Sequence, residues 1–178
     1  MAVVPDSFLG GYIPSLRKLT LDRIPIPGLP KSLLSATHLV NLDLHNIPHS
    51  GYFLSEAMLT TLSTLTRLAY LRLEFQSPRS HPDTVSRRPP PPTRTVLPVL
   101  TSFYFKGVSE YLDDFVARID TPQLDNLCIT LFNQIVFETP QFIQFISRTP
   151  TLEALEKARV SLDHGAARVN LSSQKPSH

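Results

Sequence analysis

The stretch THLVNLDLHNI (residues 37–47) decides the fold expected for this chain. Its apolar residues are Leu39, Leu42, Leu44 and Ile47, so they are spaced by three, two and three positions. Neither the 3.6-residue period of a helix nor the simple alternation of a strand produces this spacing. Leu42 and Leu44 fit a short strand that turns both side chains to one face. Leu39 and Ile47 fit the turns that enter and leave that strand.

The same spacing occurs six times along the chain. The first leucines of the copies are 23 to 32 residues apart, and self-similarity at such a period indicates a solenoid. The L-x-x-L-x-L pattern is the signature of a leucine-rich repeat. We therefore predict an α/β leucine-rich-repeat solenoid of about six irregular repeats, with short parallel strands on the concave side and helices on the convex side. The copies are PSLRKLTLDRI (14–24), THLVNLDLHNI (37–47), TRLAYLRLEFQ (66–76), PVLTSFYFKGV (98–108), PQLDNLCITLF (122–132) and PTLEALEKARV (150–160).

The segments between the copies have helical patterns. Apolar stripes predict helices over 54–65, 109–119 and 139–148, and a shorter one over 29–36. Ser109 and Thr139 are the expected N-caps. The sixth copy has Lys157 where an inward apolar residue belongs, so its strand should be weak or out of register.

The predicted organisation has five parts: a lead-in (1–13), copies one to three (14–76), an insertion (77–97), copies four to six (98–165) and a tail (166–178). The insertion is rich in proline and arginine and is expected to be disordered. Within it, Pro89, Pro92 and Arg94 match an SH3-ligand pattern. A disordered loop in place of a helix is the simpler interpretation of the same residues.

The net charge, the cysteine count and the lengths of the apolar runs exclude several classes of function. A net charge of +2 over 178 residues is too small to favour nucleic acid or an anionic membrane as a partner. The single cysteine, Cys128, permits no internal disulfide. The chain shows no signal peptide and no apolar run long enough for a membrane span. We expect an intracellular protein, cytoplasmic or nuclear.

The sequence lacks the common catalytic and metal-binding patterns. The chain has no G-x-S-x-G elbow, no P-loop and no G-x-G-x-x-G motif. His45 and His49 are four apart, but Pro48 intervenes, so a zinc site is not expected. The neighbours Asp113 and Asp114 are interpreted as surface charges. We predict no enzyme, no cofactor and no metal.

The residues that flank each inward pair should point out on the concave side. Copies two to five place there acidic, basic and tyrosine side chains, and tyrosine and arginine dominate binding hot spots. The candidate protein-binding face consists of Asp43, His45, Tyr70, Arg72, Glu74, Tyr104, Lys106 and Asn126. The alternative is an ordinary solvated face with no ligand.

The six copies, their uneven spacing and their apolar exit residues, such as Ile24 and Ile47, resemble the leucine-rich-repeat region of fungal F-box-like proteins. The resemblance covers about residues 12 to 165. It implies a protein-interaction module, the substrate-recognition arm of an F-box-type ubiquitin ligase component or a fragment of one. In that family an F-box segment docks the adaptor. The sequence shows no such segment, so it predicts a protein partner without predicting adaptor binding.

Two other interpretations stay open at the level of sequence. The repeats could be the ligand-sensing segment of a signalling or immune receptor, or a truncated product without independent function. A nucleotide-binding domain encoded upstream would favour the first, and a weakly cooperative melt would favour the second.

Overall fold

The computed structural model describes residues 11–24, 31–48, 55–76, 93–132, 139–153, 157–163 and 166–172. Within them, seven strands form one sheet, and two strands of two residues each form a separate small ladder. The elements in chain order are β1 (Lys18–Asp22), the 3-10 helix η2 (Lys31–Ser35), β2 (Asn41–Ile47), α1 (Ser55–Leu62), β3 (Tyr70–Phe75), β4 (Thr95–Val96), β5 (Ser102–Gly107), α2 (Ser109–Val116), β6 (Ile119–Asp120), β7 (Asn126–Phe132), α3 (Pro140–Arg148), α4 (Pro150–Glu153), β8 (Lys157–Asp163) and β9 (Ala166–Ser172).

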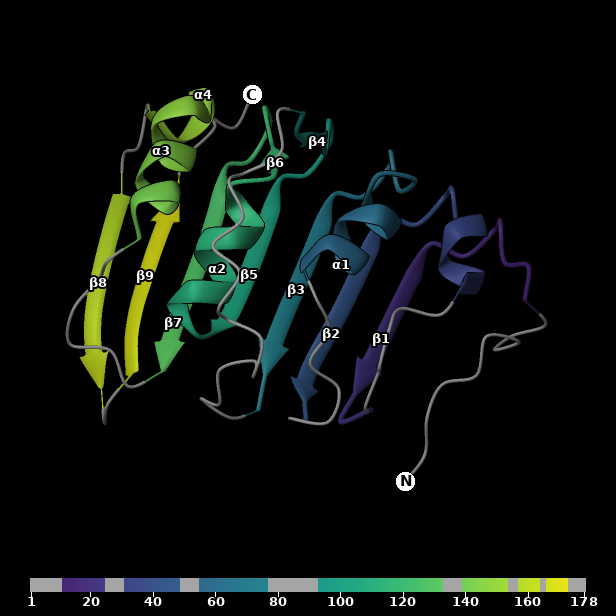
Figure 1. The fold of residues 1–178 in the computed structure, drawn as a ribbon, viewed down its shortest axis with the longest axis horizontal. Coiled ribbons are helices and arrows are strands. Elements are labelled where there is room, and N and C mark those ends of the chain that lie inside the picture. Colours follow the sequence, from purple (N-terminus) through teal and green to yellow (C-terminus); the bar gives the residue numbers. More distant parts are fainter. Residues whose placement is uncertain are drawn as a thin grey trace.

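The large sheet is mixed. Strands β1, β2, β3, β5 and β7 run parallel, side by side (Figure 1). Beyond them, β9 pairs antiparallel with β7, and β8 forms the edge. The predicted class, a helix-covered leucine-rich-repeat solenoid of about six parallel strands, is therefore wrong. The sheet reverses after its fifth strand, and the described residues hold only four α-helices, of which α4 has four residues.

The departure from the repeat begins in the sixth copy, although the reversed strand itself is β9. Pro150–Glu153 is helical, and the following strand β8 runs at the edge of the sheet. The physical reason is local pairing: the alternating segment KARVSLD is followed, two residues later, by the alternating segment AARVNLS. Two such runs form an antiparallel hairpin with little loop-closure cost. Residues 166–172, which we had assigned to the tail, thus take the place beside β7.

A bulge in β2 accounts for the irregular spacing of apolar residues. Leu44 lies opposite Leu73, and the next matched pair is Ile47 with Phe75. The bulge therefore sets two residues of β2 against one of β3, which turns Ile47 back into the core three positions after Leu44. Asn46 has φ of 52°, a left-handed conformation that asparagine tolerates better than most residues.

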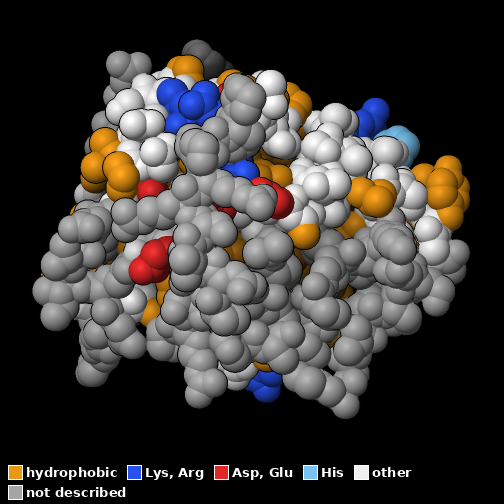
Figure 2. Space-filling view, viewed as in Figure 1, with side chains coloured by type: hydrophobic (Ala, Val, Ile, Leu, Met, Phe, Trp, Pro, Cys, Tyr) orange, Lys and Arg blue, Asp and Glu red, His pale blue; other side chains and the backbone are white. Residues whose placement is uncertain are grey.

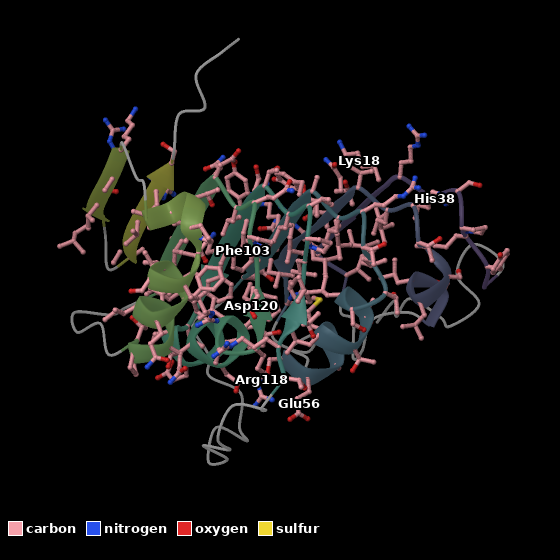
Figure 3. All side chains as sticks on the ribbon, turned by 90° about the horizontal axis from the view of Figure 1, so that it is seen from above. Lys18, His38, Glu56, Phe103, Arg118 and Asp120 are labelled. Carbon is pink, nitrogen blue, oxygen red and sulfur yellow. The ribbon has the colours of Figure 1, made fainter. Side chains whose placement is uncertain are left out.

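The core lies between the sheet and the helices, which all sit on one side of it (Figures 1 and 3). Its centre is a group of aromatic rings from β3, β5 and α2. Neighbouring ring centroids are 5.0 to 6.5 Å apart, within the range of favourable aromatic contacts. The rings belong to Phe75, Phe103, Phe105, Tyr111 and Phe115, all of them buried.

The start of α3 is capped from another helix. Asp113 of α2 accepts hydrogen bonds from the backbone N–H groups of Gln141 (2.9 Å) and Phe142 (3.0 Å). Thr139 is the N-cap residue of α3, as expected, but its side chain makes no capping hydrogen bond. Ser109 is the first residue of α2 and not its N-cap. Asp113 therefore joins two helices instead of being the surface charge that we predicted.

Part of the predicted insertion is ordered against the fold. Thr95 pairs with Ile119 in the small ladder between β4 and β6. Arg94 Nε donates a hydrogen bond to the carbonyl of Ala117 at 3.1 Å. Pro89 and Pro92 lie outside the described residues, so the SH3-ligand motif stays a prediction.

Candidate functional site

The side of the sheet opposite the helices is called here the open face. It carries the alternate residues of each strand that do not point into the core, and in the described chain no helix packs on it (Figure 3). All eight residues predicted for the binding face lie on it, on four adjacent strands. They are Asp43 and His45 on β2, Tyr70, Arg72 and Glu74 on β3, Tyr104 and Lys106 on β5, and Asn126 on β7.

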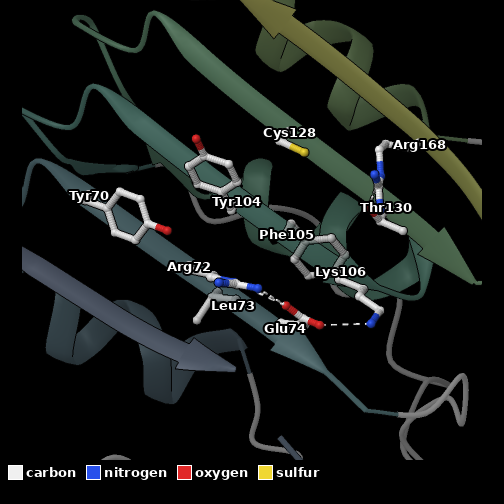
Figure 4. Close-up of a pocket in the computed structure, with 10 residues that line it drawn as sticks. All are labelled: Tyr70, Arg72, Leu73, Glu74, Tyr104, Phe105, Lys106, Cys128, Thr130 and Arg168. Carbon is white, nitrogen blue, oxygen red and sulfur yellow. Dashed lines mark hydrogen bonds and ion pairs between the residues drawn. The ribbon is translucent and has the colours of Figure 1, made fainter. Parts of the chain in front are cut away.

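Opposite charges face each other across neighbouring strands of the open face. Asp43 lies opposite Arg72, and Glu74 lies opposite Lys106. Arg72 Nη2 is 2.5 Å from Glu74 Oε2, and Lys106 Nζ is 2.9 Å from Glu74 Oε1 (Figure 4). Asp43 Oδ1 is 3.9 Å from Arg72 Nε. Such cross-strand pairs stabilise a sheet and hold the long side chains in fixed positions.

Glu74 is the centre of this network. Burial by itself raises the pKa of its carboxyl group, but the hydrogen bonds from Lys106 and Arg72 outweigh burial, so the pKa lies below its ordinary value. The carboxylate is therefore charged at neutral pH and holds both cations in place. The Arg72 side chain also forms a second bond to it, from Nε, at 3.2 Å.

We expect the substitution Glu74→Gln to lower the free energy of unfolding by roughly 1 kcal/mol near neutral pH. Because the folded-state pKa is lowered, the stabilisation by Glu74 is present above the unfolded-state pKa and is lost as pH falls through the folded-state value. The stability difference between parent and variant should therefore shrink on acidification. Urea unfolding at a series of pH values measures it, and a difference that stays constant down to about pH 2.5 contradicts it.

Two tyrosines stand next to the charges. The rings of Tyr70 and Tyr104 are 5.3 Å apart between centroids and tilted by 34°. Asn126 Nδ2 donates a hydrogen bond of 2.9 Å to the hydroxyl of Tyr104. Burial and the neighbouring Asp43 raise the pKa of Tyr70, so its hydroxyl stays protonated at neutral pH. The pair offers a partly exposed aromatic surface with polar groups at its edge.

His45 lies at the β1 side of the same face. Its Nδ1 is 3.0 Å from Asp43 Oδ1, and its Nε2 is 3.3 Å from Asp22 Oδ1. The imidazole is thus placed between two carboxylates. In the part of the chain that the structure describes, no three His, Cys, Asp or Glu residues come together as metal ligands.

A shallow cavity of about 430 Å³ opens over β3, β5, β7 and β9. It brings together five of the predicted site residues, whereas Asp43, His45 and Asn126 lie outside it. The residues that line it are Tyr70, Arg72, Leu73, Glu74, Tyr104, Phe105, Lys106, Cys128, Thr130 and Arg168 (Figure 4).

The sequence reasoning missed three polar residues of this cavity. Two of them, Cys128 and Thr130, flank the inward Ile129 and therefore follow the same alternation as Asn126. Arg168 lay in the supposed tail, although Ala167, Arg168 and Val169 begin an alternation that predicts a strand. Burial raises the pKa of Cys128 although Arg168 and Arg72 oppose it, so the thiol is mostly protonated at neutral pH.

Among β1, β2, β3, β5, β7 and β9, the carboxylates of the open face lie on the first three strands, together with the cations Lys18 and Arg72. These carboxylates are Asp22, Asp43 and Glu74. On β5, β7 and β9 the charged residues are Lys106 and Arg168, and these three strands hold no carboxylate. Arg168 Nε donates a weak hydrogen bond to Thr130 Oγ1 at 3.3 Å. The cavity is therefore cationic on the β9 side, where Arg168 is in register with Thr130 and Lys106.

Comparisons with protein-family models, with curated proteins and with solved structures found no match to this chain. Among the described helices, none has the length and apolar character needed to cross a membrane.

Proposed function

We propose that this chain is a protein-interaction module that binds an extended, acidic segment of a partner protein on its open face. The observation that carries the proposal is the cavity lined by the Tyr70–Tyr104 pair, in which strands β5, β7 and β9 contribute two charged groups, Lys106 and Arg168. Aromatic and arginine side chains that are already held in place provide binding energy at a low entropic cost.

The chemistry of the cavity selects the partner. A carboxylate of the partner can pair with Arg168, whose guanidinium fork suits bidentate contact with an acid. Aromatic or aliphatic groups of the partner can pack on the two tyrosines. Glu74 repels a second carboxylate near Arg72, which favours one direction and one position of the bound segment.

The test uses a fluorescein-labelled peptide in which glutamate and tyrosine alternate. Fluorescence anisotropy should show that the double variant Lys106→Glu, Arg168→Glu binds the peptide at least about tenfold more weakly than the parent. A variant with Tyr70→Ala, Arg72→Ala and Tyr104→Ala should lose a similar amount. The matched control is Lys18→Glu, Arg67→Glu, because both side chains are exposed and outside the cavity.

The control separates a specific site from general electrostatic attraction. An equal loss of affinity in the Lys18→Glu, Arg67→Glu variant contradicts the proposal, as does an absence of binding by the parent up to about 1 mM peptide. A peptide with lysine in place of glutamate should bind the parent more weakly than the acidic one.

The resemblance of the sequence suggests a more specific role, recognition of substrate proteins for an F-box-type ubiquitin ligase. What supports this role is the sequence pattern together with a face suited to a protein segment. A pull-down from host extract with the parent and the triple variant tests it. Ubiquitin-ligase subunits or ubiquitylated proteins must be enriched by the parent alone, and enrichment of the same proteins by both contradicts the role.

A further inference from the structure

Strand β8 ends the sheet with an edge that no described residue covers. It pairs with β9 on one side, and in the described chain nothing pairs with its other side. The backbone groups along such an edge can continue the sheet with another strand. At the opposite end of the sheet, β1 has five residues, whereas β8 has seven.

The face of β8 that points to the helix side carries exposed apolar residues. Register with β9 puts Ala158, Val160 and Leu162 in line with the buried Leu171 and Ala167. Nevertheless the exposed fractions of Val160 and Leu162 are 66% and 75%. Figure 2, which looks onto the helix side, shows hydrophobic side chains at the left-hand margin, the end of the sheet where Figure 1 places β8 and α3. Most soluble proteins cover or charge such an edge.

The sequence of β8 is complementary to itself when it is read in the opposite direction. If two copies pair antiparallel with Val160 opposite Val160, then Ala158 lies opposite Leu162 and Lys157 lies opposite Asp163. Both ends of the ladder thus bring together opposite charges, and the apolar residues stay on one face. Shifting the register by one residue sets apolar against polar faces. If the symmetric ladder is centred one residue earlier, on Arg159, the two Arg159 side chains lie opposite each other and repel.

We infer that the chain forms a symmetric dimer in which the β8 strands of two copies pair antiparallel about Val160. The two sheets then continue into one, with the open faces of both copies on the same side, because a two-fold axis perpendicular to the sheet preserves its faces. The pairing covers Val160 and Leu162 of each copy with the same residues of the other. The proposal is independent of the function proposed above, since it uses the edge of the sheet and not the cavity.

The experiment is a charge exchange, measured by sedimentation equilibrium of the full chain. The parent should be a dimer at micromolar concentration. Lys157→Asp alone places carboxylates against each other, and Asp163→Lys alone places ammonium groups against each other, so each variant should dissociate about tenfold more readily. An equimolar mixture of the two variants should recover the dimer, because every introduced charge then meets its opposite.

The monomer tolerates these changes, because Lys157 pairs with Ser172 and Asp163 pairs with Ala166 within the hairpin. As a second variant, Val160→Lys places two ammonium groups on the symmetry axis and should give a monomer. Leu34→Lys, which changes an exposed apolar residue of η2 at the other end of the sheet (Figure 1), should leave the dimer intact.

A parent that stays monomeric up to about 0.5 mM overturns the inference. So does a dimer that all these variants leave unchanged, or one that the mixture fails to restore.

Discussion

Replacing Phe103 by alanine is expected to lower the free energy of unfolding by about 3–5 kcal/mol, the largest effect of any single change considered for this chain. Phe103 is fully buried at the centre of the aromatic group. Its ring lies 5.6 Å from Phe115 on α2 and 6.5 Å from Phe105 on its own strand. The substitution removes contacts between the sheet and a helix and leaves a cavity that rigid neighbours cannot fill.

The adjacent residue provides the matched control. Tyr104 has a ring of nearly the same size on the same strand but points to the open face. Tyr104→Ala should therefore cost only about 1 kcal/mol, from its contact with Tyr70 and its bond with Asn126. Urea unfolding followed by circular dichroism measures both variants. Equal losses at the two positions would mean that the alternation of inner and outer faces along β5 is misassigned.

The second large effect is expected for Arg148→Ala, about 2–3 kcal/mol. Arg148 ends α3 and ties that helix to the end of α2 and to β6. Its Nη2 donates to the carbonyl groups of Ile119, at 3.0 Å, and Val116, and its Nε donates to Asp120 Oδ1 at 3.0 Å. The guanidinium also lies 5.3 Å from the ring centroid of Phe145. Alanine leaves two carbonyls and a carboxylate without these donors.

Two variants show whether the fork of the guanidinium causes the effect. Arg148→Lys keeps the positive charge but cannot make three bonds in one plane, so it should recover less than half of the loss. Arg94→Ala removes another arginine near Asp120, 4.0 Å away and more exposed, and should cost less than about 1 kcal/mol. Thermal and urea unfolding give both values. If Arg148→Lys behaves like the parent, charge alone is responsible, and the explanation by the three guanidinium hydrogen bonds is contradicted.

The five parallel strands could be located from sequence because their determinants are local. Each strand has two buried apolar residues separated by one outward residue, as in Leu42 and Leu44 or Phe103 and Phe105. This alternation determines which face of the strand points to the core. The outward residues between and beside them, Tyr104 and Lys106 among them, followed from the same alternation. Those features required no knowledge of which strands are neighbours.

What the sequence reasoning could not supply depends on distant contacts. The repeat spacing predicts Leu152 in the turn that enters a sixth parallel strand, whereas residues 150–153 form a helix and Leu152 is buried there. It gave no reason to place Arg168 in the cavity, because that position follows from the antiparallel pairing of β9 with β7. The capping of α3 by Asp113 joins residues 28 and 29 positions apart and has no local pattern.

The order of strands in the sheet also affects how the protein is made. From β1 to β7, each strand of the large sheet lies beside the one synthesised before it, so each can be added to an existing edge as it leaves the ribosome. Strand β8 is an exception, because its place lies beyond β9, which is synthesised later. Until residues 166–172 emerge, β8 has no neighbour, and its apolar residues are open to other nascent chains. Translation must therefore pass Ser172 before either of the last two strands can be added.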